Sequence, residues 1–256
     1  MSESRQRWRL VFARDEEARF LSHLDAVKLW ERAFRRGNIP VATSEGFSPR
    51  PRVVFAAPLP LGMLAEHELA DIFLSERLTQ EDLRARLAAG MPRGYRIVDL
   101  QDEWVGAPAL APQLVAADYR MVLLGVEPAG ADQGMRALLA AERLPREKRH
   151  ENKAVVYDLR PLVMGLRVDE LAATSSAPLA ADTCALAGAE PRAAAVCLWM
   201  RLRHSQDEGS GRAEEVVAAL GDAMPGGPRV GLDASRNIEI VHPVRERLWL
   251  TGELAA

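Results

Sequence analysis

Cysteine is scarce in this chain, which has only Cys184 and Cys197 among its 256 residues. Two thiols cannot build a disulfide framework, and they cannot supply the three or four thiolates that hold an iron–sulfur cluster. The five histidines and two cysteines also occur nowhere at the spacing of a structural zinc site. We therefore expect this chain to hold no metal and no cofactor.

Long apolar runs are missing as well. No stretch approaches the ~18 apolar residues of a membrane span, and the polar start MSESRQRWRL has no apolar core of the kind a secretory signal needs. The sequence therefore predicts a cytoplasmic protein with no membrane partner. The phosphate-binding and nucleophile motifs G-x-x-x-x-G-K-[ST], G-x-S-x-G and G-x-G-x-x-G are absent too.

Neither sign of charge dominates, because the formal net charge is −3. This balance does not indicate a nucleic-acid-binding protein, yet a local basic stripe on a neutral chain remains compatible with one. Aromatic residues make up only 5% of the chain, so platforms for stacking bases are few. If the chain binds RNA, contacts to the backbone of a folded RNA are therefore better supported than recognition of base identity.

What the chain does contain is a pattern of strands and helices. Strands are predicted over 7–13, 52–57, 66–74 and 95–100, and helices over 22–36 and 79–90. The resulting order β-α-β-β-α-β is that of the ferredoxin-like fold, in which helices cover one face of an antiparallel sheet.

The segment 102–113 carries two prolines and a glycine and is interpreted as a linker. The second half repeats the same order more loosely, except for 170–192, which the pattern does not assign. We therefore predict an α+β protein with two ferredoxin-like (βαββαβ) halves in tandem. The first domain spans 1–104 and includes a Gly/Pro loop, and the second, more divergent one spans 113–256.

Most of the candidate functional residues lie between Phe20 and Gly62. Ser22 is a good N-cap for an amphipathic helix that ends before Gly37. His23 begins this helix and points into its apolar arc, where it is either a residue bonded to nearby backbone or a functional group.

A loop with restricted backbone follows the helix. Gly46 can take backbone angles that other residues avoid, Pro49 and Pro51 stiffen the chain around Arg50, and a second turn ends at Gly62. Arg50 is either a solvated charge or a ligand-binding residue.

The runs LSHLD, RAFRRGNIP and SEGFSPRPRVVFAAPLPLG, followed by 68–72, resemble the radical SAM-linked family of bacterial proteins of unknown function. That family's pattern is Ser-Gln-Gly-Phe, a small polar residue, then Pro-His-Pro-Lys. This chain keeps the serine, glycine, phenylalanine and prolines but has Glu45, Arg50 and Arg52 at the other places. The resemblance implies a partner, a radical SAM enzyme with a cobalamin-binding domain. With two cysteines, this chain is not that enzyme.

At the level of the fold, a ferredoxin-like pair with a glycine-containing loop is similar to the CRISPR repeat-processing endoribonuclease superfamily. This similarity implies that His23 is a candidate acid or base and that Arg50 and Arg52 hold phosphates.

Two sets of residues are candidates for RNA binding. The first set surrounds the loop and comprises Arg32, Arg36, Phe47, Arg50 and Arg52, with Phe47 as the best stacking candidate. The second set lies in a basic hairpin and comprises Arg146, Lys148 and Arg149, which could contact phosphates. The alternative is that the charged tip of this hairpin is simply solvated.

Asp158-Leu159-Arg160-Pro161 resembles an acidic-Arg-Pro turn of the radical SAM-linked family. We expect Asp158 and Arg160 to form a local ion pair that fixes the geometry of the second half.

The favoured hypothesis is a non-catalytic accessory protein of a radical SAM/cobalamin enzyme that binds the RNA substrate of that enzyme. One alternative is a metal-independent endoribonuclease that uses His23. The other is a protein–protein adaptor that binds no RNA and docks through Phe47, Leu59, Leu61 and Met63.

Overall fold

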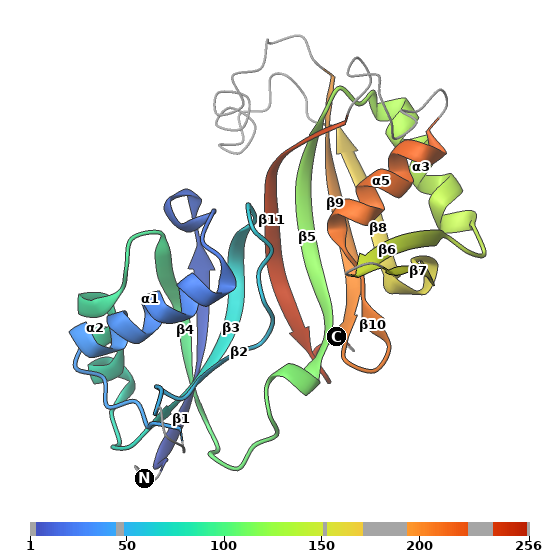
Figure 1. Cartoon of the computed structure of the whole chain (residues 1–256). Coiled ribbons are helices and arrows are strands. Elements are labelled where there is room, and N and C mark those ends of the chain that lie inside the picture. Colours follow the sequence, from blue (N-terminus) through green and yellow to red (C-terminus); the bar gives the residue numbers. More distant parts are fainter. Residues whose placement is uncertain (1–3, 45–48, 151–152, 171–193, 225–237, 255–256) are drawn as a thin grey trace. The chain divides into compact units, whose positions relative to one another are not determined.

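The computed structural model describes residues 4–44, 49–150, 153–170, 194–224 and 238–254. The chain forms two compact units (Figure 1). Unit 1 comprises Met1–Leu114 and Arg245–Ala256, and unit 2 comprises Val115–Val244. The predicted class is confirmed at the level of a mixed α+β protein with mostly antiparallel strands.

Unit 1 contains the strands β1 (Gln6–Arg14), β2 (Val53–Phe55), β3 (Leu64–Leu74) and β4 (Tyr95–Glu103). They lie in the order β2-β3-β1-β4, and each neighbouring pair is antiparallel. The helices α1 (His23–Arg36) and α2 (Gln80–Gly90) follow β1 and β3. The predicted succession β-α-β-β-α-β is therefore present in this unit.

The core of unit 1 lies between the sheet and the two helices (Figure 1). Alternate residues of β1 belong to this core, and α1 and α2 contribute Trp30, Phe34, Leu83 and Leu87 to it. Trp30 has no exposed surface, and its ring lies 4.8 Å from that of Phe12 in an edge-on arrangement. Burial of such aromatic side chains is a main source of stability for the unit.

Both helices begin with the same cap. Ser22 accepts a hydrogen bond from the backbone N–H of Asp25, and its hydroxyl donates to the Asp25 carboxylate. Thr79 and Asp82 repeat this arrangement at α2. Each cap satisfies a backbone N–H group of the first helical turn that has no partner within the helix.

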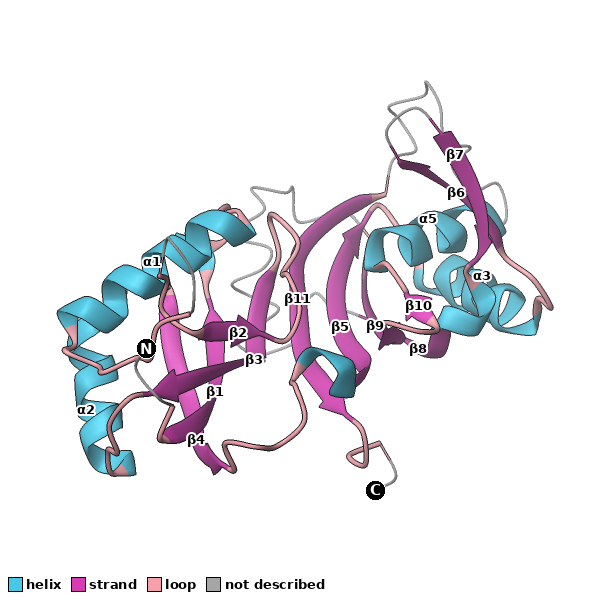
Figure 2. Ribbon diagram, turned by 60° about the horizontal axis from the view of Figure 1, so that its bottom comes forward, coloured by secondary structure: helices cyan, strands magenta, loops and turns pink. Residues whose placement is uncertain are grey.

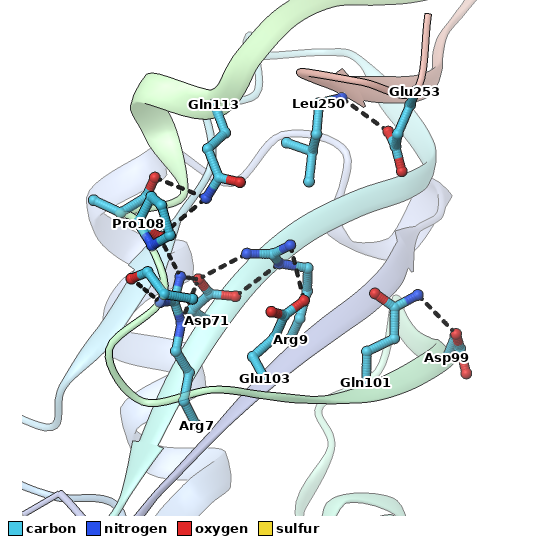
Figure 3. Close-up of polar contacts among 12 residues, drawn as sticks. Arg7, Arg9, Asp71, Asp99, Gln101, Glu103, Pro108, Gln113, Leu250 and Glu253 are labelled. Carbon is cyan, nitrogen blue, oxygen red and sulfur yellow. Dashed lines mark hydrogen bonds and ion pairs between the residues drawn. The ribbon is translucent and has the colours of Figure 1, made fainter. Parts of the chain in front are cut away.

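On the opposite face of the sheet, buried charged side chains form hydrogen bonds and ion pairs with one another (Figure 3). Asp71 of β3 accepts hydrogen bonds from the Nε atoms of Arg7 and Arg9, both at 3.0 Å, and Arg9 also pairs with Glu103. Arg7 donates to the backbone carbonyls of Ala107 and Pro108. The segment that the sequence predicted to be a linker is thus tied to the sheet of unit 1.

Unit 2 is built on β5 (Leu114–Leu124), β8 (Val163–Glu170) and β9 (Ala195–Ser205), with β5 and β8 each pairing antiparallel with β9. Among its described residues the α-helices are α3 (Pro128–Ala140) and α5 (Ala213–Ala223), and the short strand β10 (Gly209–Ser210) also pairs with β9. The last strand, β11 (Glu239–Leu250), begins in unit 2 and ends in unit 1.

Gly134 has a packing role in unit 2. A Cβ atom at this position would lie 2.9 Å from Met224 and 3.1 Å from the carbonyl oxygen of Leu220, at the end of α5. Glycine therefore allows α3 and α5 to approach closely.

The turn at Asp158 fixes local geometry, as expected, but through different partners. The Asp158 carboxylate accepts hydrogen bonds from the backbone N–H groups of Leu144 and Arg160. Its ion pair, at 3.9 Å, is with Arg143. The Arg160 guanidinium donates instead to the carbonyls of Leu139 and Val163, so the predicted Asp158–Arg160 ion pair is replaced by backbone hydrogen bonds.

A two-stranded ribbon, β6 (Pro145–His150) and β7 (Lys153–Asp158), precedes this turn. The region 171–193, which includes most of the stretch that the sequence did not assign, lies outside the described residues. Within the described ranges, every helix is too short or too polar to cross a membrane.

Candidate functional site

A small pocket of unit 1 contains His23. The pocket lies on the face of the sheet that the helices cover, and β1, α1, β2, β3, β4 and the turn before β3 all contribute to it. Its lining residues are Phe12, Arg14, His23, Ala26, Phe55, Ala57, Leu59, Glu68 and Tyr95. The cavity volume of about 20 Å³ suffices for one or two water molecules. It can therefore take one small group of a ligand rather than a whole cofactor.

His23 is half-buried in the wall of this pocket. It is the first residue of α1, after the Ser22 cap, and its ring meets that of Phe55 edge-on with 5.7 Å between the centroids. The prediction that His23 points into the apolar side of the helix is thus confirmed.

Arg14 is a buried cation at the end of β1, with 3% of its surface exposed. Its guanidinium donates to the backbone carbonyls of Arg19, Leu21, Pro60 and Met63. One side chain thus ties the segment before α1 to the turn before β3. These partners are neutral, so the positive charge of Arg14 remains available to a ligand.

Tyr95 is the first residue of β4 and is also buried. Burial raises the pKa of its hydroxyl above 10.0, and the neighbouring Arg14 guanidinium partly opposes this shift. The phenol is therefore neutral at physiological pH and can donate a hydrogen bond.

Glu68 of β3 adds a carboxylate that is already paired. The Nε atom of Arg245 donates to it at 2.6 Å, and a second guanidinium nitrogen contacts its other oxygen. Both side chains are almost fully buried. Since Glu68 and Arg245 compensate one another, Arg14 leaves the pocket with one excess positive charge, which favours an anionic or hydrogen-bond-accepting group.

Sequence reasoning found His23 but missed Arg14, Glu68 and Tyr95. Glu68 and Tyr95 lie in stretches that were assigned to strands, and Arg14 directly follows another predicted strand. One signal was available, because Glu68 is an acid within the predicted strand EHELADIFL. A buried acid needs a partner, but that partner, Arg245, is 177 residues away in the sequence.

The arginines predicted around the loop do not form one surface with His23. Arg52 lies on the other face of the sheet, where its guanidinium stacks on the Phe73 ring at 3.9 Å and donates to Ser4. Arg32 is exposed on α1, and Arg36 donates to the Gly90 carbonyl of α2. Arg50 is exposed on its loop.

Other predicted loop residues divide into described and undescribed ones. Gly46 and Phe47 lie outside the described residues. Pro49 is exposed, and Pro51 forms an isolated bridge with Thr43. Gly62 has a φ of +80°, a conformation that favours glycine, in agreement with its predicted role in the turn.

The second predicted patch is in unit 2. Arg146 pairs with Asp222 of α5 at 2.8 Å, so part of its charge is compensated. Lys148 and Arg149 are adjacent residues of β6.

The residues proposed for an adaptor surface are unequally exposed. Met63 is 2% exposed and belongs to the core, which corrects the expectation that it docks on a partner. Leu59 lines the pocket, and Leu61 is 67% exposed. Among the described residues, no group of three or more His, Cys, Asp or Glu side chains could hold a metal ion.

Comparison with known proteins identifies the family. Residues 7–192 match the family described as "Uncharacterized protein conserved in bacteria (DUF2344)", and the chain belongs to this family. No curated protein matches the chain.

Among solved structures, the crystal structure of an unknown protein from Galdieria sulphuraria is similar to this chain, with 15% sequence identity. The match covers 85% of this chain and 91% of that chain, with a TM-score of 0.24. A similarity at this level carries no argument about fold or function.

Proposed function

We propose that this chain is a non-catalytic accessory protein of a radical SAM/cobalamin enzyme and that it binds the RNA substrate of that enzyme in the cytoplasm. The observation that carries the proposal is the pocket, where His23, Tyr95 and the buried cation Arg14 converge on a space of about 20 Å³. A pocket of this size holds one group of a large substrate in place. The excess positive charge suits a phosphate oxygen.

The partner enzyme enters the proposal through the resemblance of 20–62 to the radical SAM-linked family. These 256 residues contain two cysteines, fewer than the three thiolates that the radical-generating cluster needs, so the proposal assigns that cluster to the partner enzyme. In this proposal the chain binds the RNA substrate and positions it for the partner enzyme.

The experiment recovers the RNA that is crosslinked to the native protein and compares its binding to wild type, to His23→Ala and to His67→Ala. His67→Ala is the matched control. His67 is exposed on β3 and is not part of the pocket lining. We expect a defined RNA whose affinity falls about tenfold in His23→Ala, the loss of one hydrogen bond to a charged group. His67→Ala should bind as wild type does.

Other outcomes separate the alternatives. If no RNA is enriched, the RNA hypothesis fails and the adaptor remains. If His23→Ala and His67→Ala lose affinity equally, the pocket is not the binding site.

A second candidate is a metal-independent endoribonuclease. The lining of the pocket contains Arg14 and Tyr95 together with His23. A histidine can transfer protons, and a nearby cation can stabilise developing negative charge. This candidate predicts RNA cut at one position, with cleavage lost and affinity kept in His23→Ala.

We also propose that both units are ferredoxin-like. The support is the strand pairing. In unit 1 the order is β3-β1-β4 with β2 paired to β3, and in the second half it is β9-β5-β11 with β8 paired to β9. In each series the third strand in sequence lies between the first and the second. The ribbon β6–β7 is then an insertion in the second half. A tandem of this kind is the basis for the similarity to CRISPR repeat-processing endoribonucleases.

A further inference from the structure

The polar groups around the His23 pocket include donors that have no acceptor. The two terminal nitrogens of the Arg14 guanidinium donate to backbone carbonyls, but its Nε–H has no hydrogen-bond partner among the described residues. The same is true of the Tyr95 hydroxyl and of the indole N–H of Trp30. All three atoms are buried, and a buried donor without an acceptor lowers stability. Native proteins therefore keep few such groups.

The three unpartnered donors lie close together. Burial raises the pKa of the Tyr95 hydroxyl, and Arg14 and Trp30 both oppose this shift because they are near the oxygen. The ring centroids of Trp30 and Tyr95 are 5.6 Å apart. Within this group the phenol oxygen is the one acceptor, and it can accept at most two hydrogen bonds. Since the group has three hydrogens to donate, at least one of them is left without an acceptor.

The charge around the pocket is positive. The pocket lies on the face of the unit 1 sheet that α1 and α2 cover (Figure 2), and the first turn of α1 contributes His23 and Ala26 to its lining. The N-terminus of a helix carries a partial positive charge. Because Arg245 neutralises Glu68, the charge of Arg14 is not offset. The chemistry of the lining therefore suits an anion that accepts hydrogen bonds and donates none.

The exposure of the lining residues separates a mouth from a floor. The mouth consists of His23, Phe55 and Leu59, which are half-buried. The floor consists of the buried lining residues, which are Phe12, Arg14, Ala26, Ala57, Glu68 and Tyr95. The cavity of about 20 Å³ has room for one or two atoms of the size of a water oxygen. A group that reaches the floor must therefore be narrow and must be attached to the rest of its molecule on one side only.

We propose that the pocket binds the terminal phosphate of an RNA strand, with Arg14 and Tyr95 donating hydrogen bonds to its oxygens. A terminal phosphate is joined to the strand through a single ester bond, and its charged oxygens are strong acceptors. An internal phosphate has a ribose on each side, so it is too wide for the mouth. A 2′-hydroxyl is neutral, and base edges carry donors as well as acceptors. This inference rests on the proposed function and specifies which group of the RNA enters the pocket.

The test varies the end of the RNA and the hydroxyl of Tyr95. Short synthetic RNAs of one sequence carry a 5′-phosphate, a 3′-phosphate or hydroxyls at both ends, with fluorescein on an internal base. Fluorescence anisotropy measures their affinity for the full chain as wild type, Tyr95→Phe and Tyr157→Phe. Tyr157→Phe is the matched control, because it removes the same hydroxyl from β7 of unit 2.

We expect wild type and Tyr157→Phe to bind one of the phosphorylated RNAs at least about tenfold more tightly than the RNA with hydroxyl ends. In Tyr95→Phe this preference should fall about tenfold, the effect of losing one hydrogen bond to a charged group. The substitution keeps the ring and changes no charge, so a general attraction to the extra phosphate would persist in it.

Thermal unfolding of the free protein, followed by circular dichroism, separates binding from structure. Because the Tyr95 hydroxyl has no partner among the described residues, Tyr95→Phe should keep the Tm of wild type. A lowered Tm would show that the hydroxyl has a structural role and would contradict its assignment to a ligand.

The remaining outcomes distinguish this inference from the proposed function. Equal affinity of wild type for all three RNAs would overturn the inference and leave the proposed function standing. A preference that persists in Tyr95→Phe would assign it to charge alone and not to the pocket. If inorganic phosphate displaced the phosphorylated RNA as well as an unlabelled copy of that RNA does, the ligand would be free phosphate and not an RNA end. Failure of every RNA to bind wild type would overturn both proposals.

Discussion

Tyr95 is the pocket residue whose ionisation reports most directly on its surroundings. Its hydroxyl is buried near Arg14 and Trp30. Burial disfavours the charged phenolate, and this effect outweighs the attraction of Arg14. The folded state therefore stabilises the neutral phenol, and this contribution to stability is complete below pH 10.0 and is lost as the pH rises through the folded pKa.

We predict that Tyr95 forms tyrosinate only above pH 10.0. The measurement is an alkaline titration of near-ultraviolet absorbance, taken as the difference between wild type and Tyr95→Phe. The difference is needed because the pKa of Tyr157 is raised as well, mainly by burial. A difference spectrum with its midpoint at or below 10.0 would contradict the burial of this hydroxyl.

At the scale of elements, the Asp158 turn connects β7 to β8 through backbone hydrogen bonds. The N–H of Leu144 and then the N–H of Arg160 hold the pKa of Asp158 below 3.8. Because the folded pKa is depressed, the ionised carboxylate contributes stability above pH 3.8. That contribution is lost as the pH falls through the folded pKa.

We predict that Asp158→Ala lowers the Tm at neutral pH and that its difference from wild type shrinks as the pH falls below 3.8. Thermal unfolding followed by circular dichroism over a pH series measures this. Asp169→Ala is the control, because Asp169 is exposed and pairs with Arg167 within its own strand. A Tm difference that is constant down to the lowest pH would refute the role of the ionised carboxylate.

For the whole molecule, β11 brings together residues that are far apart in the chain. The strand begins in unit 2, but its Arg245 belongs to unit 1 and neutralises Glu68 of the same unit. Removing one partner of a buried ion pair leaves an uncompensated charge inside the protein, and this costs about 3–5 kcal/mol.

We predict that Arg245→Ala lowers the free energy of unfolding of unit 1 by about 3–5 kcal/mol. Arg247→Ala is the matched control, because Arg247 is exposed and pairs with Glu253 at 3.9 Å, and it should cost about 1 kcal/mol or less. Urea unfolding followed by tryptophan fluorescence measures both. Should Arg245→Ala fail to fold, Arg245→Lys keeps a charge near Glu68 and should recover part of the stability. Equal effects of the two alanine variants would contradict the importance of the buried pair.

Local patterns in the sequence determined the helix cap at Ser22, the orientation of His23, the turn at Gly62 and the order of elements in unit 1. Each depends on residues a few positions apart, through helical periodicity, capping or backbone conformation. Tertiary structure alone decided that Arg14, Glu68 and Tyr95 join His23, that Arg52 lies on the other face of the sheet, and that Arg245 completes the site. These contacts join residues far apart in the chain, and no periodicity or spacing encodes which strands become neighbours.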